Sequence, residues 1–197
     1  MSSPAAIGFR AHSGWAAAVA VTGLADAPAV IMRRRIEMRE TAAAGPSQPY
    51  HAAVGLDIRE AEQLIARSAA RAAAMAATGL RAMVEDLGQL GHGITGCGLL
   101  TGSGRPLPAL ERILAAHPLL HTAEGELFRE ALRAAIRQCG LQPIEMKERE
   151  LFTRAAARLR LPASRIEEHV AAMGKSIGPP WRQDEKFAAV AAWLALC

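Results

Sequence analysis

Apolar residues alternate with glycine or polar residues at the start of the chain. Within residues 5–12, the apolar residues Ile7, Phe9 and Ala11 alternate with Gly8, Arg10 and His12. This period of two predicts a β-strand with two different faces. Turn-forming residues follow at 13–14 and within 22–28, so strands are also predicted over 15–21 and 29–38. Because short connections join antiparallel neighbours, these three strands should be antiparallel.

The pattern then becomes helical. Residues 42–50 contain a glycine and two prolines and predict a loop. Small apolar residues recur at steps of three or four from Ile58 to Leu87, which predicts a helix that packs flat on the sheet and could break at Gly79. The glycines and Cys97 of a fourth strand, 94–101, indicate close approach of a neighbouring backbone or helix.

Strand and helix alternate in the second half. The predicted helices span 108–116, 122–138, 148–159, 162–173 and 184–196, and the fifth strand spans 141–146. Gly140 is placed to cap one helix, and Ser164 with Glu167 has the spacing of a capping box. This alternation predicts parallel additions to the sheet, so the chain is interpreted as one α/β domain over 1–197 with a mixed five-stranded sheet and flanking helices.

Composition narrows the functional classes only slightly. Apolar residues make up 51% and charged residues 21%, which is typical of globular proteins and not of disordered chains. The net charge of +4 is too small and too dispersed either to indicate or to exclude a nucleic-acid partner. Three widely spaced cysteines predict free thiols. Without a secretory leader or a long uncharged apolar run, we expect a cytoplasmic protein with no membrane partner.

Arg33, Arg34 and Arg35 form the densest basic run. Consecutive residues of a strand point to opposite faces, which weakens the interpretation of this run as one basic patch. A solvated edge strand that uses charge to block aggregation explains it as well.

Three short motifs resemble a known superfamily. Ala6-Ile7-Gly8-Phe9 resembles the opening strand of RuvC-type Holliday-junction resolvases, and Ser13-Gly14-Trp15 resembles the turn of their uncharacterised relatives. Trp181-Arg182-Gln183-Asp184-Glu185-Lys186, followed by an alanine-rich helix, resembles their final acidic motif. With the order of elements, these motifs resemble the ribonuclease H-like superfamily and imply its mixed five-stranded sheet.

The resemblance implies carboxylates that bind two divalent metals, Mg²⁺ or Mn²⁺, for phosphodiester hydrolysis. This sequence departs from that pattern. The first acidic position falls at Arg10, and the fourth strand ends in Thr101 without an acid. Asp184 and Glu185 retain the last motif, although Asp184 also fits an N-cap.

Two functions follow from these residues. The first is an atypical metal-dependent nuclease or nucleic-acid-binding protein. Its candidate metal or acid/base residues are His12, Glu124, Asp184 and Glu185, and its candidate nucleic-acid contacts are Arg10, Lys175, Trp181 and Lys186. The alternative is a non-catalytic protein that keeps the fold for homo-oligomerisation or partner binding. A third possibility is nucleotide binding, as in actin-like ATPases, but the first hairpin of this sequence has no recognisable phosphate-binding motif. Trp181 has a second explanation, since beside two prolines it could pack a loop onto the core.

One further group of residues has side chains suited to chemistry. His117, His121 and Glu124 gather near a helix start, where imidazole and carboxylate suit proton transfer or a transition metal. The two rings share a face only if the helix is continuous, and Pro118 argues against that. Histidines and acids at a helix start are also common without any function. Residues 102–105 could cradle a phosphate but lack a P-loop ending.

Overall fold

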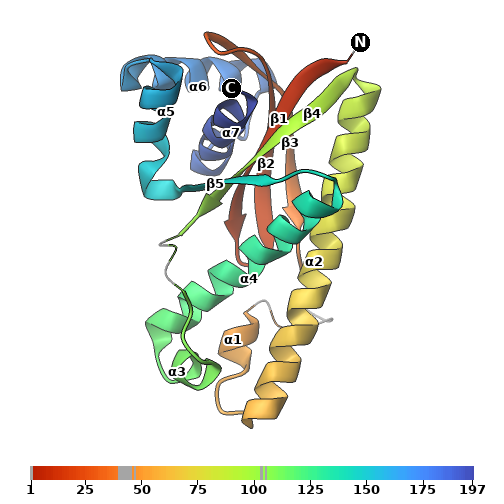
Figure 1. The fold of residues 1–197 in the computed structure, drawn as a ribbon, viewed down its shortest axis with the longest axis vertical. Coiled ribbons are helices and arrows are strands. Elements are labelled where there is room, and N and C mark those ends of the chain that lie inside the picture. Colours follow the sequence, from red (N-terminus) through yellow and green to blue (C-terminus); the bar gives the residue numbers. More distant parts are fainter. Residues whose placement is uncertain (1, 40–45, 47, 103, 105) are drawn as a thin grey trace.

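The computed structural model describes residues 2–39, 46, 48–102, 104 and 106–197 (Figure 1). Its strands are β1 (Ser3–His12), β2 (Trp15–Leu24), β3 (Ala27–Glu37), β4 (His92–Thr101) and β5 (Pro143–Lys147). They form one sheet in the order β3-β2-β1-β4-β5. Strands β1, β2 and β3 pair antiparallel, whereas β4 pairs parallel with β1 and β5 parallel with β4. The predicted five-stranded mixed sheet is confirmed.

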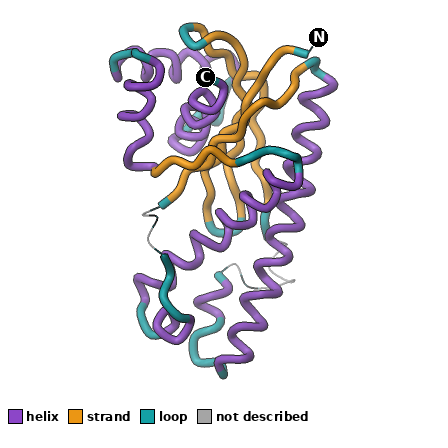
Figure 2. The backbone as a smooth tube through the Cα atoms, in the orientation of Figure 1, coloured by secondary structure: helices purple, strands orange, loops and turns teal. Residues whose placement is uncertain are grey.

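Helices cover both faces of this sheet (Figure 2). They are α1 (Pro49–Ala52), α2 (Ile58–Gln89), α3 (Leu110–Leu114), α4 (His117–Gln138), the 3₁₀ helix η2 (Glu148–Glu150), α5 (Leu151–Leu159), α6 (Ala163–Ile177) and α7 (Gln183–Leu196). One core lies between the sheet and α2 with α4, and a second lies between the sheet and α5, α6 and α7. The first half of α2 and the start of α4 continue beyond the sheet together with α1 and α3, forming a helical extension (Figure 1).

Glycines allow α7 to lie directly on the sheet. A Cβ atom at Gly8 of β1 would lie 1.9 Å from the carbonyl oxygen of Ala188, and one at Gly98 of β4 would lie 2.3 Å from that of Ala191. Real side chains cannot approach a backbone so closely. The predicted close packing against β4 is therefore confirmed, and it brings the N-terminus of α7 to the end of β1.

Two expectations about the first helices are wrong. The helix does not break at Gly79, because α2 continues through it and the missing side chain makes room for Ile36 of β3, whose Cγ2 would lie 3.0 Å from a Cβ there. The predicted loop also ends early, since Pro49 and Tyr50 begin α1. Proline suits the first helical turn, where its missing N–H has no intrahelical partner. Residues 42–45 and 47 of that predicted loop lie outside the described residues.

Two expectations about helix ends have different outcomes. Gly140 has a φ of 76° directly after Cys139, the C-cap of α4, so the predicted glycine cap is confirmed. The capping box at Ser164 is wrong, because the N-cap of α6 is Pro162 and Ser164 already lies in the first turn. In the part of the chain that the structure describes, none of the helices is apolar enough over a sufficient length to span a membrane.

Candidate functional site

Arg10 lies at the centre of an ion-pair network near the carboxyl end of β1. Its guanidinium donates from Nε to Glu148 at 3.0 Å, from Nη2 to the same carboxylate at 2.7 Å, and from Nη1 to Asp184. Glu148 directly follows β5, and Asp184 lies in the first turn of α7. Parallel strands end at one edge of a sheet, where ligand sites commonly form. The fold thus gathers three charged residues from distant parts of the chain.

Arg10 is the permanently charged member of this network. The hydrogen bond to Glu148 raises the pKa of Arg10 further above its usual range, against the opposing effect of burial. Only 15% of the Arg10 side chain is exposed, and its guanidinium also lies 5.0 Å from the ring centre of Phe187. A permanently charged guanidinium therefore stands between two carboxylates.

His12 joins the network from the last position of β1. Its Nε2 lies 2.8 Å from the Asp184 oxygen that also accepts from Arg10. The imidazole is stacked on Trp15, with 4.4 Å between ring centres and 13° between planes. The guanidinium of Arg35 lies 3.9 Å from the Trp15 ring centre in a cation–π contact. The structure therefore brings the predicted residues His12 and Asp184 into direct contact and refutes the N-cap alternative for Asp184, because the N-cap of α7 is Arg182.

A groove of about 440 Å³, which we call the arginine groove, adjoins this network. It is lined by Trp15, Ala17, Arg33, Arg34, Arg35, Pro180, Arg182, Asp184 and Glu185. The lining thus includes four arginines and two carboxylates, although the guanidinium of Arg34 points to the other face of the sheet. The positive charge comes from an edge strand, as predicted, and from the segment before α7.

The three arginines of β3 alternate between faces, as predicted. Arg34 donates to Asp86 of α2 at 2.5 Å, on the face opposite α7. Arg33 donates to the carbonyls of Gly178 at 3.0 Å, Pro179 at 3.1 Å and Pro180. Carbonyls are neutral acceptors, so these bonds position the loop before α7 without neutralising Arg33.

Trp181 fixes the same loop from its other end. The indole Nε1 donates to the carbonyl of Val170 at 2.9 Å. The ring also covers Gly174 of α6, where a Cβ would lie 2.2 Å from it. The packing interpretation of Trp181 is confirmed.

The other candidates on α6 and α7 have simpler surroundings. The Glu185 carboxylate lines the arginine groove and accepts the backbone N–H of Arg182 at 2.8 Å, which satisfies a free donor at the helix start. Lys175 and Lys186 are exposed, and neither is among the described residues that line the groove. Glu148 and Arg182 were not among the candidate residues predicted from the sequence. The position of Glu148 directly after the fifth strand could have indicated a site residue.

The predicted residue Glu124 does not belong to the network that joins His12 and Asp184. It lies on α4, and its hydrogen bonds are made with α1. The buried carboxylate, 1% exposed, accepts the backbone N–H groups of Tyr50 at 2.8 Å and His51 at 3.1 Å. Its Oε1 also lies 3.2 Å from Nδ1 of His51. Burial raises the pKa of Glu124, although the hydrogen bonds from α1 oppose that shift.

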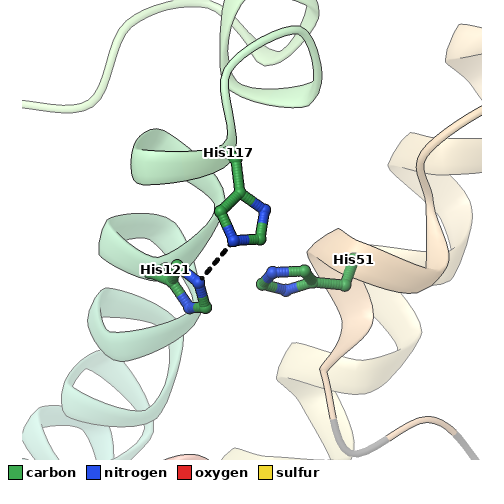
Figure 3. A group of neighbouring side chains, drawn as sticks. All are labelled: His51, His117 and His121. Carbon is green, nitrogen blue, oxygen red and sulfur yellow. Dashed lines mark hydrogen bonds between the residues drawn. The ribbon is translucent and has the colours of Figure 1, made fainter.

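The expectation that Pro118 interrupts the helix between His117 and His121 is wrong. Helix α4 begins at His117, and Pro118 occupies its first turn, where a proline costs no intrahelical hydrogen bond. His117 and His121 therefore lie one turn apart on one face. Figure 3 shows His51 of α1 pointing toward both of them.

Comparisons with solved structures identify the fold. A structure of Thermus thermophilus RuvC gives a TM-score of 0.51 at 10% sequence identity, over 96% of this chain and 92% of that chain. RuvC of the same organism in complex with a Holliday junction substrate gives the same score and identity, over 96% and 90%. The chain has a ribonuclease H-like fold. A scan against family models and a search of the curated proteins found no match.

The two divalent metals that the ribonuclease H-like resemblance implies do not fit the residues at this edge. Arg10 lies between Glu148 and Asp184 and donates to both, so a cation of the chain already binds the carboxylates. A guanidinium has no lone pair for a metal. The last residue of β4 is Thr101, a buried hydroxyl side chain instead of a carboxylate.

Proposed function

We propose that the protein binds nucleic acid in the arginine groove and does not cleave it by two-metal hydrolysis. The observation that carries this proposal is the ion-pair network itself. Arg10 holds both carboxylates that a metal would need, while Arg33 and Arg182, which line the adjoining groove, keep charges that phosphates can bind. Guanidinium groups match the geometry of phosphate oxygens.

The one aromatic ring among the described residues that line the groove is already covered. His12 is stacked on Trp15, and the guanidinium of Arg35 lies over the same ring, so both faces of the indole have partners. The arginines are therefore the groups that support nucleic-acid binding here, through contacts to backbone phosphates.

Location supports the same conclusion. Through Asp184 the groove adjoins the ion-pair network at the carboxyl end of β1, and α/β sheets commonly bind ligands at such strand ends. One structural neighbour of this fold holds a Holliday junction substrate. The charged lining also favours nucleic acid over the alternative role in oligomerisation, because the cores of homodimer interfaces are apolar and depleted of charge.

Fluorescence anisotropy tests the proposal. Labelled single-stranded DNA, duplex DNA and a four-way junction should each be titrated with the protein in EDTA, over a series of salt concentrations. We expect metal-independent binding that weakens as salt rises, and Arg182→Gln should remove about one phosphate contact, or about 0.7–0.9 of the slope of log K against log salt. Arg67→Gln, on the exposed surface of α2, removes the same charge and should leave the slope unchanged.

Cleavage assays with Mg²⁺ and Mn²⁺ complete the test. We expect the three DNA substrates to remain intact. If none of the three DNA substrates binds at low salt, the proposal is refuted. Cleavage that Asp184→Asn abolishes would instead show that this edge of the sheet is a nuclease site.

A further inference from the structure

Three histidines converge in the helical extension, on residues that the arginine groove does not use. One ring nitrogen from each of His51, His117 and His121 lies within 4.8 Å of the others (Figure 3). We call these residues the histidine cluster. His117 and His121 are exposed at the start of α4, and His51 is half-buried on α1. The cluster therefore opens to solvent on one side.

The two histidines of α4 point the equivalent ring nitrogen, Nε2, toward each other. Nε2 of His121 lies 3.0 Å from Nε2 of His117. Two neutral imidazoles can make this contact only if one of the two nitrogens carries a proton. A shared metal ion would use both lone pairs, and zinc–nitrogen bonds of about 2.0–2.1 Å in a tetrahedron separate two ligand nitrogens by about 3.4 Å. The observed spacing is close to that requirement.

Glu124 orients the third histidine. The buried carboxylate lies 3.2 Å from Nδ1 of His51, which in the neutral ring makes Nδ1–H the donor and leaves a lone pair on Nε2. Histidines that bind metals commonly donate their other ring N–H to a carboxylate, which fixes the tautomer and the direction of the ring. His51 and Glu124 have this arrangement.

Two buried atoms beside the cluster lack hydrogen-bond partners among the described residues: Nε2 of His51 and Oε2 of Glu124. A buried polar atom without a partner costs free energy, so such atoms call for an explanation. A metal bound by Nε2 would satisfy the imidazole.

We propose that His51, His117 and His121 bind a first-row transition metal ion, Zn²⁺ or a close relative, with Glu124 as the residue that positions His51. Imidazole nitrogens suit Zn²⁺, Co²⁺, Ni²⁺ and Cu²⁺, whereas Mg²⁺ and Ca²⁺ prefer oxygen ligands. Three protein ligands leave a fourth coordination position open to solvent. Because the ligands come from two helices, the ion also links α1 to α4.

Cobalt provides a direct test, because Co²⁺ in a low-coordinate site absorbs visible light. Tag-free protein carrying Cys197→Ser, which removes an exposed thiol, should be treated with chelator and titrated with Co²⁺ and then Zn²⁺. We expect one Co²⁺ per chain with visible absorption, displaced by Zn²⁺, and a Zn²⁺-dependent rise in the unfolding temperature. His117→Ala and His121→Ala should each weaken binding at least tenfold, and Glu124→Gln by about 10–100-fold.

His169→Ala is the matched control, because it removes an imidazole that packs against Trp193 on the other side of the sheet. It should leave Co²⁺ binding unchanged. Absence of saturable Co²⁺ and Zn²⁺ binding, or an unchanged affinity in His121→Ala, would overturn the proposal. Since His117 and His121 are exposed, their variants should fold, and far-UV circular dichroism of the metal-free proteins checks this. The result does not depend on whether the arginine groove binds DNA.

Discussion

Arg10 and Glu148 form a two-point ion pair, in which Nε and Nη2 of the guanidinium donate to the two carboxylate oxygens at 3.0 and 2.7 Å. This fork geometry is the strongest form of side-chain hydrogen bonding. It joins the end of β1 to the first residue of η2, which directly follows β5. With Asp184 as a second acceptor, Arg10 provides the positive charge that a metal would otherwise supply at this edge.

Substitutions can test whether the Arg10 guanidinium occupies the place of a metal ion between the two carboxylates. Arg10→Asp would place a third carboxylate beside Glu148 and Asp184, so like-charge repulsion should lower the unfolding temperature in EDTA. Mn²⁺ should restore part of that loss by binding the carboxylates. Arg10→Met, which also removes the ion pairs but adds no carboxylate, is the control and should show no recovery with Mn²⁺. Equal responses of the two variants would contradict the account.

Glu148 should contribute measurably to stability. Glu148→Gln keeps the shape of the side chain but removes its charge, so we expect the free energy of unfolding to fall by about 1–2 kcal/mol, toward the lower end for hydrogen bonds to charged groups because the carboxylate is 38% exposed. Glu150→Gln is the control, since its ion pairs with Lys147 and Arg149 are both 3.5 Å long and exposed, and it should change stability by less than about 0.5 kcal/mol. Urea denaturation measures both. A smaller effect at Glu148 than at Glu150 would show that the network is unimportant for stability.

The contact between α7 and the sheet depends on glycine. Gly98→Ala should destabilise the protein by about 3 kcal/mol, because the new Cβ would meet the Ala191 carbonyl and force α7 away. Gly88→Ala provides the opposite case: its Cβ meets no described atom within 4 Å, and alanine in a helix should stabilise by about 0.5–1 kcal/mol. Displacement of α7 also moves Arg182, the N-cap of that helix, so Gly98→Ala should weaken DNA binding as well.

Low pH should weaken the ion pairs of Glu126 on α4. Burial disfavours the charged form of Glu126, but hydrogen bonds from Arg133 at 2.6 Å and Arg129 at 3.0 Å outweigh it and lower the pKa of the carboxyl below its ordinary 4.5. A lowered folded-state pKa stabilises the protein above the unfolded-state pKa, and this contribution is lost as pH falls through the folded-state value. The side chain is 37% exposed, so we expect less than about 1 kcal/mol.

Urea denaturation at neutral pH and at successively lower pH measures this effect. Glu126→Gln should be less stable than the wild type at pH 7, and the difference should shrink once Glu126 itself becomes protonated. The exposed Glu62→Gln serves as a control for the loss of one carboxyl group. A difference that grows toward low pH would contradict the assigned direction of the shift.

Local patterns predicted most of the fold, because the alternation around Ile7 and Phe9 and the helical stripe from Ile58 to Leu87 are dictated by which face is buried. The ends of elements were less accessible. Pro118 suggested a break, yet it lies in the first turn of a helix, since a proline is compatible with a first turn but not with an interior.

The site was predictable only in part, because its partners come from distant segments. Asp184 was found through a motif and His12 through its place at the end of the first predicted strand, but Glu148 reaches Arg10 only because β5 pairs parallel with β4. His51 joins His121 only because α1 packs against α4. Neither relationship has a period or spacing in the sequence.

The central claim is that the arginine groove binds nucleic acid without a metal. Its most direct test measures the binding of a labelled single DNA strand in EDTA, by fluorescence anisotropy, for the wild type, Arg182→Gln and Arg67→Gln. The account predicts saturable binding without metal, a lower affinity and a shallower salt dependence for Arg182→Gln, and wild-type behaviour for Arg67→Gln. No binding in EDTA with binding restored by Mg²⁺ or Mn²⁺, or equal losses in the two variants, would contradict it.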